Sequence, residues 1–222
     1  MSIARPKYVT FDCYGTLIWF RMGDMTRQLF ARRVPPDRMD HFIRDFAAYR
    51  FDEVLGAWKP YAQVIAGALE RTCRRWNVTF DGADAQRLYA AVPSWGPHPD
   101  VPEPLARVAR HIPLVILSNA SNDQIHVNVA KLGAPFHAAY TAEQAEAYKP
   151  RFRAFEYMLD QLGCGPEEVL HVSSSLRYDL MPASDLGIRH KVFVARGHDP
   201  GAPAYGYHDV RNLSGLPVIV GL

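Results

Sequence analysis

Four short apolar runs, each followed at once by polar turn residues, constrain the fold more than any other feature of the sequence. Such compact runs are typical of strands that are buried on both faces of a sheet. The sequence therefore predicts four buried strands. They are KYVTFD at residues 7–12, PLVILSN at 113–119, EVLHVSS at 168–174 and HKVFVA at 190–195.

Segments with the apolar period of a helix lie between these runs, and several of them end at a glycine that suits a helix C-terminus. They are PEPLARVARH at 102–111, NDQIHVNVAKLG at 122–133, FRAFEYMLDQLG at 152–163 and YDLMPASDLG at 178–187. Alternation of strand and helix is typical of a parallel sheet covered by helices on both faces. The predicted fold class is therefore α/β, with a doubly wound, Rossmann-like core.

The segment from residue 20 to residue 92 follows a different pattern, because consecutive amphipathic helices occur there without an intervening strand. The predicted helices are DMTRQLFARR, DRMDHFIRDFAAYRFDEVL and YAQVIAGALERTCRRW. The Pro-rich stretch VPSWGPHPDVPEP then resists both helix and central strand, so we expect it to return the chain to the core. The predicted domains are a discontinuous core, residues 1–19 and 93–222, and a helical cap, residues 20–92.

Composition excludes several classes of function. Hydrophobic residues make up 48% of the 222 residues, which is enough for one substantial core, and 25 basic residues nearly balance 23 acidic ones. We therefore expect no nucleic acid or anionic membrane as a partner. Three scattered cysteines favour a reducing cytoplasm over a disulfide framework. The start MSIARPK lacks the apolar core of a signal peptide, and no apolar window is long enough to span a membrane.

Chemically active side chains stand where the predicted strands end, and these ends meet at one edge of a parallel sheet. Asp12 ends the first strand, with Gly15 and Thr16 close behind it. Taken alone, an Asp after a strand is more often a turn or cap residue than a nucleophile. Ser118 with Asn119, Lys149 and Asp179 follow in order along the chain. Together these residues predict a site with a nucleophile, neutral donors, a cation and a second acid.

The order of these motifs resembles the haloacid dehalogenase superfamily over nearly the whole chain. DCYGT, SNAS, YKP and SSSLRYD are similar to its first, second, third and fourth motifs, and the helical segment lies where the family has its cap. Phosphatases of the superfamily carry a second Asp two residues after the nucleophile, a position that is Tyr14 here. The resemblance is therefore to the branch of L-2-haloacid dehalogenases.

Charge counting favours the same branch. A magnesium phosphatase needs several carboxylates, because Mg²⁺ prefers hard oxygen ligands. Here Ser174 stands where the phosphatases have an acid, so only Asp12 and Asp179 face Lys149. A net charge of about −1 suits a small monoanion and a reaction without metal or other cofactor. Lys149 is expected to lie about 4 Å from Asp12 and to keep it ionised.

The resemblance implies a two-step displacement on a short 2-haloacid. Asp12 attacks C2, expels halide and forms an ester, which water then cleaves to a 2-hydroxyacid of inverted configuration. The implied catalytic residues are Asp12, Lys149, Asp179, Thr16 and, on the second cap helix, Arg44, with Arg50 as the other candidate for the halide cation. The implied substrate-binding residues are Tyr14, Ser118, Asn119, Ser173 and Ser175, with Lys149 also holding the substrate carboxylate.

Three positions depart from the dehalogenase pattern. Ser175 replaces an Asn, SSSLRYD is one residue longer before its acid, and Phe155 stands where a Tyr often follows the motif lysine. Relatives use these positions to place water and the substrate carboxylate, so substrate choice and ester hydrolysis are the properties that the departures affect.

Other interpretations stay open at this stage. On the same fold, the chain could be a magnesium-dependent small-molecule phosphatase, a hydrolase of strained 2-carboxylate rings, or a catalytically silent protein that binds a small anion. The family often dimerises, so the resemblance suggests a homodimer. His98, His126, His171 and His198 lack metal-ligand spacing and are expected to be satisfied or surface histidines. Cys13 is expected to pack in the core.

Overall fold

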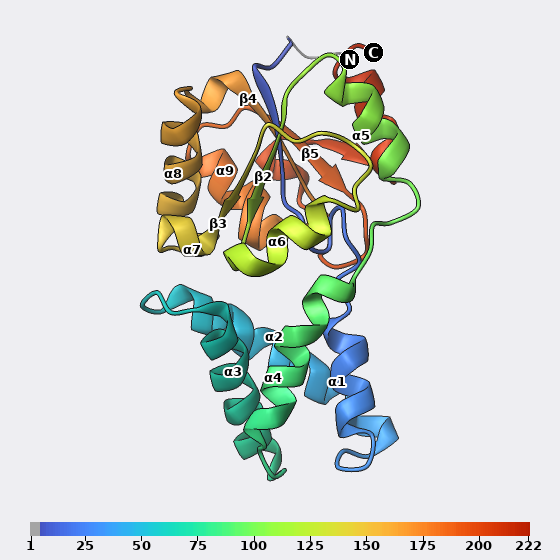
Figure 1. The fold of residues 1–222 in the computed structure, drawn as a ribbon, viewed down its shortest axis with the longest axis vertical. Coiled ribbons are helices and arrows are strands. Elements are labelled where there is room, and N and C mark those ends of the chain that lie inside the picture. Colours follow the sequence, from blue (N-terminus) through green and yellow to red (C-terminus); the bar gives the residue numbers. More distant parts are fainter. Residues whose placement is uncertain (1–4) are drawn as a thin grey trace. The chain divides into compact units, whose positions relative to one another are not determined.

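A computed structural model describes residues 5–222, so residues 1–4 of the predicted core lie outside the described part. The chain forms a six-stranded, fully parallel sheet in the order β3-β2-β1-β4-β5-β6 (Figure 1). The strands are β1 (Tyr8–Phe11), β2 (Leu114–Ser118), β3 (Ala138–Thr141), β4 (Val169–Ser173), β5 (His190–Val194) and β6 (His208–Val210). The predicted α/β fold with a doubly wound sheet is confirmed.

All four predicted strands are present, and β3 and β6 are additional. Both additional strands lie at an edge of the sheet and are only partly buried. Their sequences, AAYT and HDV, lack the continuous apolar run that marks a strand buried on both faces. The sequence pattern therefore detected the four central strands and missed the two edges.

Helices connect the strands and cover both faces of the sheet, with α8 and α9 on one side and α5 on the other (Figure 1). Helix α8 ends at Gly163, whose φ of +58° places it in the left-handed region that glycine tolerates. The helices of this part are α5 (Pro102–Ala109), α6 (Asn122–Val129), α7 (Ala142–Ala145), α8 (Phe152–Leu162), α9 (Met181–Asp185) and α10 (Leu216–Ile219).

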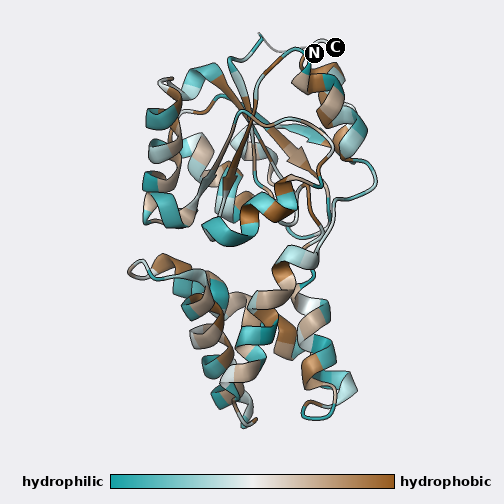
Figure 2. Ribbon diagram, in the orientation of Figure 1, coloured by the Kyte–Doolittle hydropathy of each residue, from teal (hydrophilic) through white to brown (hydrophobic). Residues whose placement is uncertain are grey.

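The core lies between the sheet and its covering helices. Val115 and Leu117 of β2 pack with Phe155 and Met158 of α8, and all four side chains are buried. Figure 2 shows the central strands mostly in the colour of hydrophobic residues, whereas the outer helices mix both colours. Burial of this apolar surface is the main favourable contribution to the stability of the sheet.

The chain divides into two compact units. The first unit contains the sheet and consists of two chain segments, one that ends at Trp19 and one that begins at Gly96. The second unit is Phe20–Trp95, which lies between them in the sequence. The second unit consists of the helices α1 (Met22–Phe30), α2 (Met39–Leu55), α3 (Tyr61–Trp76) and α4 (Gly82–Ala91). The three predicted helices of this segment are present, and α4 is a fourth. The predicted return to the core at residue 93 corresponds to Gly96 in the structure.

The sheet topology decides where a site can form. Strand β1 lies between β2 and β4, so the carboxyl ends of these three parallel strands are neighbours. Side chains just beyond those ends can therefore meet although they are far apart in the sequence. Within residues 5–222, no helix has both the length and the apolar character that a membrane crossing requires.

Candidate active site

Asp12 directly follows β1 and is 8% exposed. Its amide N–H donates to the carbonyl of Val172 at 3.1 Å, which extends the pairing with β4 by one residue. The chain then turns through Gly15, whose φ of +96° is unfavourable for other residues. This turn brings Thr16 back, and its hydroxyl donates to Oδ2 of Asp12 at 2.6 Å. The carboxylate is therefore fixed at the tip of the strand.

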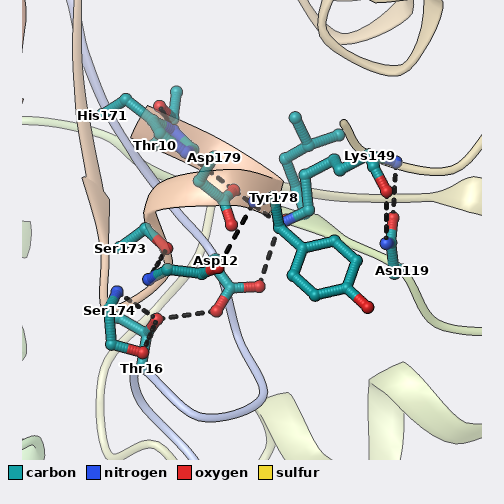
Figure 3. A network of polar contacts seen from close by, with 12 residues as sticks. Thr10, Asp12, Thr16, Asn119, Lys149, His171, Ser173, Ser174, Tyr178 and Asp179 are labelled. Atoms are coloured by element: carbon teal, nitrogen blue, oxygen red, sulfur yellow. Dashed lines mark hydrogen bonds and ion pairs between the residues drawn. The ribbon is translucent and has the colours of Figure 1, made fainter. Parts of the chain in front are cut away.

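Lys149 faces Asp12 from the loop between α7 and α8, and it is 1% exposed (Figure 3). Its ammonium donates to Oδ1 of Asp12 at 2.9 Å, to Oδ1 of Asp179 at 2.7 Å and to the carbonyl of Leu117 at 2.8 Å. An ammonium has three N–H groups, so all of them have an acceptor. The contact with Asp12 is closer than expected, and the expected contact of Lys149 with the substrate carboxylate stays a prediction.

Asn119 supports Lys149 from the end of β2. Its side-chain oxygen accepts from the amide of Lys149 at 2.7 Å, and its side-chain nitrogen donates to the carbonyl of Lys149 at 2.9 Å. This pair of bonds fixes the backbone from which the ammonium reaches Asp12. The family resemblance implied a substrate-binding role for Asn119, and the structure adds this second role.

Asp179 lies in a π-helical turn at Leu176–Leu180 and is fully buried. The amide of Leu180 donates to the carbonyl of Ser175, and that of Met181 donates to the carbonyl of Leu176. Single π-turns occur frequently at functional sites. The fourth motif is one residue longer than the dehalogenase pattern, and the wider turn accommodates a longer segment while Asp179 still reaches Lys149.

The three charged groups shift one another's proton affinity. Burial raises the pKa of Asp12 above its ordinary value and the charge of Asp179 adds to this, while Lys149 opposes it. For Asp179, burial also acts to raise the pKa, but the Lys149 ammonium and the contact with His171 prevail and lower it. Burial alone would lower the pKa of Lys149, yet the two carboxylates raise it. The ammonium thus stays protonated between the acids.

The structure places the predicted substrate-binding residues in different environments. Ser118 is 1% exposed, and its hydroxyl has no hydrogen-bond partner within the described chain. The Tyr14 hydroxyl donates to the side-chain oxygen of Asn128 at 2.8 Å. The Ser173 hydroxyl accepts from the amide of Ser175 at 3.0 Å. Of these three serine and tyrosine hydroxyls, that of Ser118 is therefore the one available to hydrogen-bond a ligand.

Ser175 caps the π-turn. Its hydroxyl donates to Oδ2 of Asp199 at 3.0 Å and accepts from the amide of Tyr178 at 3.3 Å. The same carboxylate oxygen of Asp199 accepts from the amide of Leu176 at 2.9 Å. Ser175 thus orders the turn that carries Asp179, a role that the sequence did not reveal because Asp199 is distant along the chain.

In the helical unit, Arg44 and Arg50 lie on helix α2 and differ in their surroundings. Arg44 is exposed to solvent. The guanidinium of Arg50 lies 5.0 Å from the ring centre of Phe20 and 5.1 Å from that of Phe46. Two aromatic faces of this kind stabilise the cation by cation–π attraction. Arg44 therefore has the freer side chain, and Arg50 the more ordered one.

Four residues of the site were missed as functional: Thr10, His171, Ser174 and Asp199. His171 was expected to be a satisfied or surface histidine, and it is fully buried with Nε2 3.0 Å from Oδ1 of Asp179. The amide of Ser174 donates to the Thr16 hydroxyl at 2.9 Å. Strand alternation was the available signal, because Thr10 precedes Asp12 by two residues and His171 precedes Ser173 by two.

Two neighbouring side chains have packing roles. Phe155 is fully buried, and its ring meets that of His171 edge to face at 5.5 Å. It therefore brings no hydroxyl to the site in place of the tyrosine of relatives. Cys13 is fully buried and burial raises the pKa of its thiol, so the expected packing role agrees with its surroundings.

The sequence is similar to that of known proteins. Residues 6–187 match the sequence model of the haloacid dehalogenase-like hydrolases. The chain is 31% identical to haloacetate dehalogenase H-2 of Moraxella sp. (strain B) over 55% of its length and 56% of that protein. It is 31% identical to (S)-2-haloacid dehalogenase 4A of Burkholderia cepacia, over 69% of its length and 68% of that protein.

The fold is also similar to solved structures. One is the L-2-haloacid dehalogenase from Xanthobacter autotrophicus with chloropropionic acid covalently bound, with a TM-score of 0.78 at 23% identity. The alignment covers 97% of this chain and 98% of that one. At this identity the likeness establishes the fold alone.

Proposed function

Because the chain belongs to the haloacid dehalogenase-like hydrolases, we propose that it hydrolyses short L-2-haloacids to 2-hydroxyacids and halide through an ester on Asp12. The single observation that carries the proposal is the buried Asp12 carboxylate, held by Lys149 at 2.9 Å and by Thr16 at 2.6 Å. Hydrogen bonds to both oxygens restrict rotation of the carboxylate, so it is held in one orientation for attack on the substrate. The names of the relatives support the substrate class.

In the first step, an oxygen of Asp12 forms a bond to C2 of the substrate, and the bond from C2 to the halogen breaks with its electron pair leaving on the halide. Burial favours this step, because a poorly solvated carboxylate gains more by forming a neutral ester than one in water. The configuration at C2 inverts, since the attack occurs opposite the leaving group.

In the second step, water attacks the carbonyl carbon of the ester. We assign removal of its proton to Asp179, whose Oδ2 is buried and has no hydrogen-bond partner within the described chain. The bond between that carbon and the bridging oxygen, which Asp12 supplied in the first step, then breaks, and the proton passes to that oxygen to give the 2-hydroxyacid. Lys149 compensates the charge of both acids throughout.

The donor set also bears on the rival activity, a magnesium-dependent phosphatase. Mg²⁺ prefers several carboxylate oxygens. Asp12 and Asp179 are both paired with Lys149, and within residues 5–222 no three or more His, Cys, Asp or Glu side chains converge as metal ligands would. These residues do not fit a magnesium site, so a reaction without metal remains our prediction.

The direct test is halide release from L-2-chloropropionate and from fluoroacetate in the presence of EDTA, with a phosphatase assay in Mg²⁺ beside it. We expect halide release that the chelator leaves unchanged. Phosphate release that requires Mg²⁺ would assign the chain to the phosphatases instead. Saturable binding of the haloacid without turnover would identify a silent anion-binding protein. Opening of a strained, nitrogen-containing 2-carboxylate ring at C2, with the nitrogen retained as an amine in the 2-hydroxyacid product, would identify the remaining alternative.

The pH dependence of kcat/KM for halide release follows from the shifted pKa values. Protonated Asp12 cannot attack, and burial places its pKa above the ordinary 3.8, so activity should fall with decreasing pH through a value above 3.8. The pKa of Lys149 is raised above 10.5, so its deprotonation should cause no loss below that pH. An acid limb below 3.8 would contradict this account of the nucleophile.

We keep Arg44 as the proposed cation for the leaving halide and test it against Arg50. Arg44→Ala should lower kcat/KM by about 10²-fold with little change in thermal stability, because the side chain is exposed. Arg50→Ala removes two cation–π contacts and should lower the free energy of unfolding by roughly 1–2 kcal/mol. Halide release and thermal melting of both variants decide between them, and the reverse pattern would transfer the halide role to Arg50.

The homodimer and the cytoplasmic location suggested by the sequence also stay predictions. Light scattering of the purified chain would test the first.

A further inference from the structure

A row of buried polar side chains leads from the interior of the sheet to the site. Thr10 of β1 and His171 of β4 are partners in the register of the two strands, and both are fully buried. The Thr10 hydroxyl lies 2.8 Å from Nδ1 of His171, and Nε2 of His171 lies 3.0 Å from Oδ1 of Asp179 (Figure 3). The proposed chemistry uses Asp179 and leaves the other two residues without a role.

The contacts fix which nitrogen of His171 carries the proton. The Asp179 carboxylate can only accept when ionised, so Nε2 must be protonated to make a hydrogen bond with it. In a neutral ring Nδ1 then has only a lone pair, and the Thr10 hydroxyl can donate to it. The 2.8 Å contact is also shorter than the 3.3 Å from the same hydroxyl to the carbonyl of Leu170. With Nδ1 held by Thr10, the ring presents its Nε2–H group to Asp179.

The Nε2–H group determines how the Asp179 carboxylate is held. Lys149 at 2.7 Å and His171 at 3.0 Å both donate to Oδ1. Oδ2 is buried and has no hydrogen-bond partner within the described residues. Rotation of the Asp179 carboxyl group about its Cβ–Cγ bond would move Oδ1 away from both donors and break both hydrogen bonds. The free oxygen is therefore a consequence of how the other is anchored.

We propose that His171 is a positioning residue for ester hydrolysis: fixed by Thr10, it anchors Oδ1 of Asp179 so that Oδ2 remains free to take the proton of the attacking water. This inference rests on the proposed function and concerns its second step alone. Formation of the ester uses Asp12 and Lys149, which His171 does not contact by hydrogen bonds. Loss of His171 should therefore separate the two steps.

The test compares His171→Phe with His171→Gln. Phe keeps an aromatic ring beside Phe155 but has no N–H, whereas Gln can offer an N–H to Oδ1. With L-2-chloropropionate, rapid quench and mass spectrometry measure the ester on Asp12, and product release measures its hydrolysis. In His171→Phe we expect hydrolysis to slow by about 10–100-fold, ester formation to change by no more than a few-fold, and the ester to accumulate.

In His171→Gln, hydrolysis should return to within several-fold of the wild-type rate. The acid limb of the hydrolysis step should move to higher pH in His171→Phe, because the contact with His171 lowers the pKa of Asp179. Equal slowing of both steps, or equal defects in both variants, would show that His171 only supports the fold and would overturn the proposal.

A second measurement needs neither variant nor turnover. Nitrogen-15 NMR of the wild-type protein should show a proton on Nε2 of His171, and a ring protonated at Nδ1 alone would overturn the proposal even if the variants fail to fold. If the wild-type protein releases no halide from any haloacid, the proposed function fails. The position of the ring proton would then still decide whether Thr10 and His171 anchor Asp179.

Discussion

Replacing Asp12 with Asn should lower kcat for halide release by at least about 10⁴-fold. The amide has nearly the same shape as the carboxylate but is a far weaker nucleophile, so the ester cannot form. The amide oxygen can keep the donor contact from Thr16 at 2.6 Å, but the amide nitrogen then faces the Lys149 ammonium, which donates to the other carboxylate oxygen at 2.9 Å. Thermal melting of the variant should therefore accompany the assay, so that a change in the fold is distinguished from the loss of kcat.

The matched control is Asp160→Asn, which removes an acid that is exposed on α8. It should change activity by less than about twofold, as expected of surface substitutions. Mass spectrometry of the Asp12→Asn protein should accompany the assay, because hydrolysis of the new amide would restore the acid. Activity at wild-type level in a protein that still carries Asn at position 12 would contradict covalent catalysis.

Replacing Lys149 with Met should lower kcat/KM by about 10²–10³-fold. The substitution leaves two buried carboxylates facing each other without a cation, since Lys149 is paired with both. Repulsion between them raises the pKa of the pair, so the acid limb of the pH profile should move to higher pH. Lys149→Arg should recover little, because a planar guanidinium cannot reproduce the three contacts of the ammonium.

Lys191→Met serves as the control for loss of a buried ammonium. Lys191 is 4% exposed and its ammonium donates to the carbonyl of Ile188, and within residues 5–222 it forms no ion pair with a carboxylate. Both lysine variants should lose stability, which thermal melting measures. Lys149→Met alone should shift the acid limb. If the acid limb of the pH profile is unshifted in Lys149→Met, the Lys149 ammonium does not lower the pKa values of Asp12 and Asp179.

The sequence predicted the parts of the fold that depend on local pattern. Central strands carry continuous apolar runs, so β1, β2, β4 and β5 were predicted, whereas the partly buried edges β3 and β6 carry too few apolar residues. The π-turn could not be predicted either. The motif showed one additional residue, but only the backbone bonds around Asp179 reveal how the chain accommodates it.

For the site, motif residues were predictable and their partners were not. Asp12, Lys149 and Asp179 come from separate motifs, and the structure brings them within hydrogen-bonding distance. The contacts of Asn119 with the backbone of Lys149, and of Ser175 with Asp199, join distant segments that no local pattern connects. Such contacts depend on strand order and loop geometry, which become known only with the three-dimensional structure.

The central claim is that Asp12 forms a covalent ester, and a single turnover in water enriched in oxygen-18 tests it most directly. With enzyme in excess over L-2-chloropropionate, water attacks the ester at the carboxyl carbon of Asp12, so the label should appear in the Asp12 carboxylate and the first 2-hydroxyacid should be unlabelled. Label found directly in that first product, with none in the peptide that contains Asp12, would contradict the account.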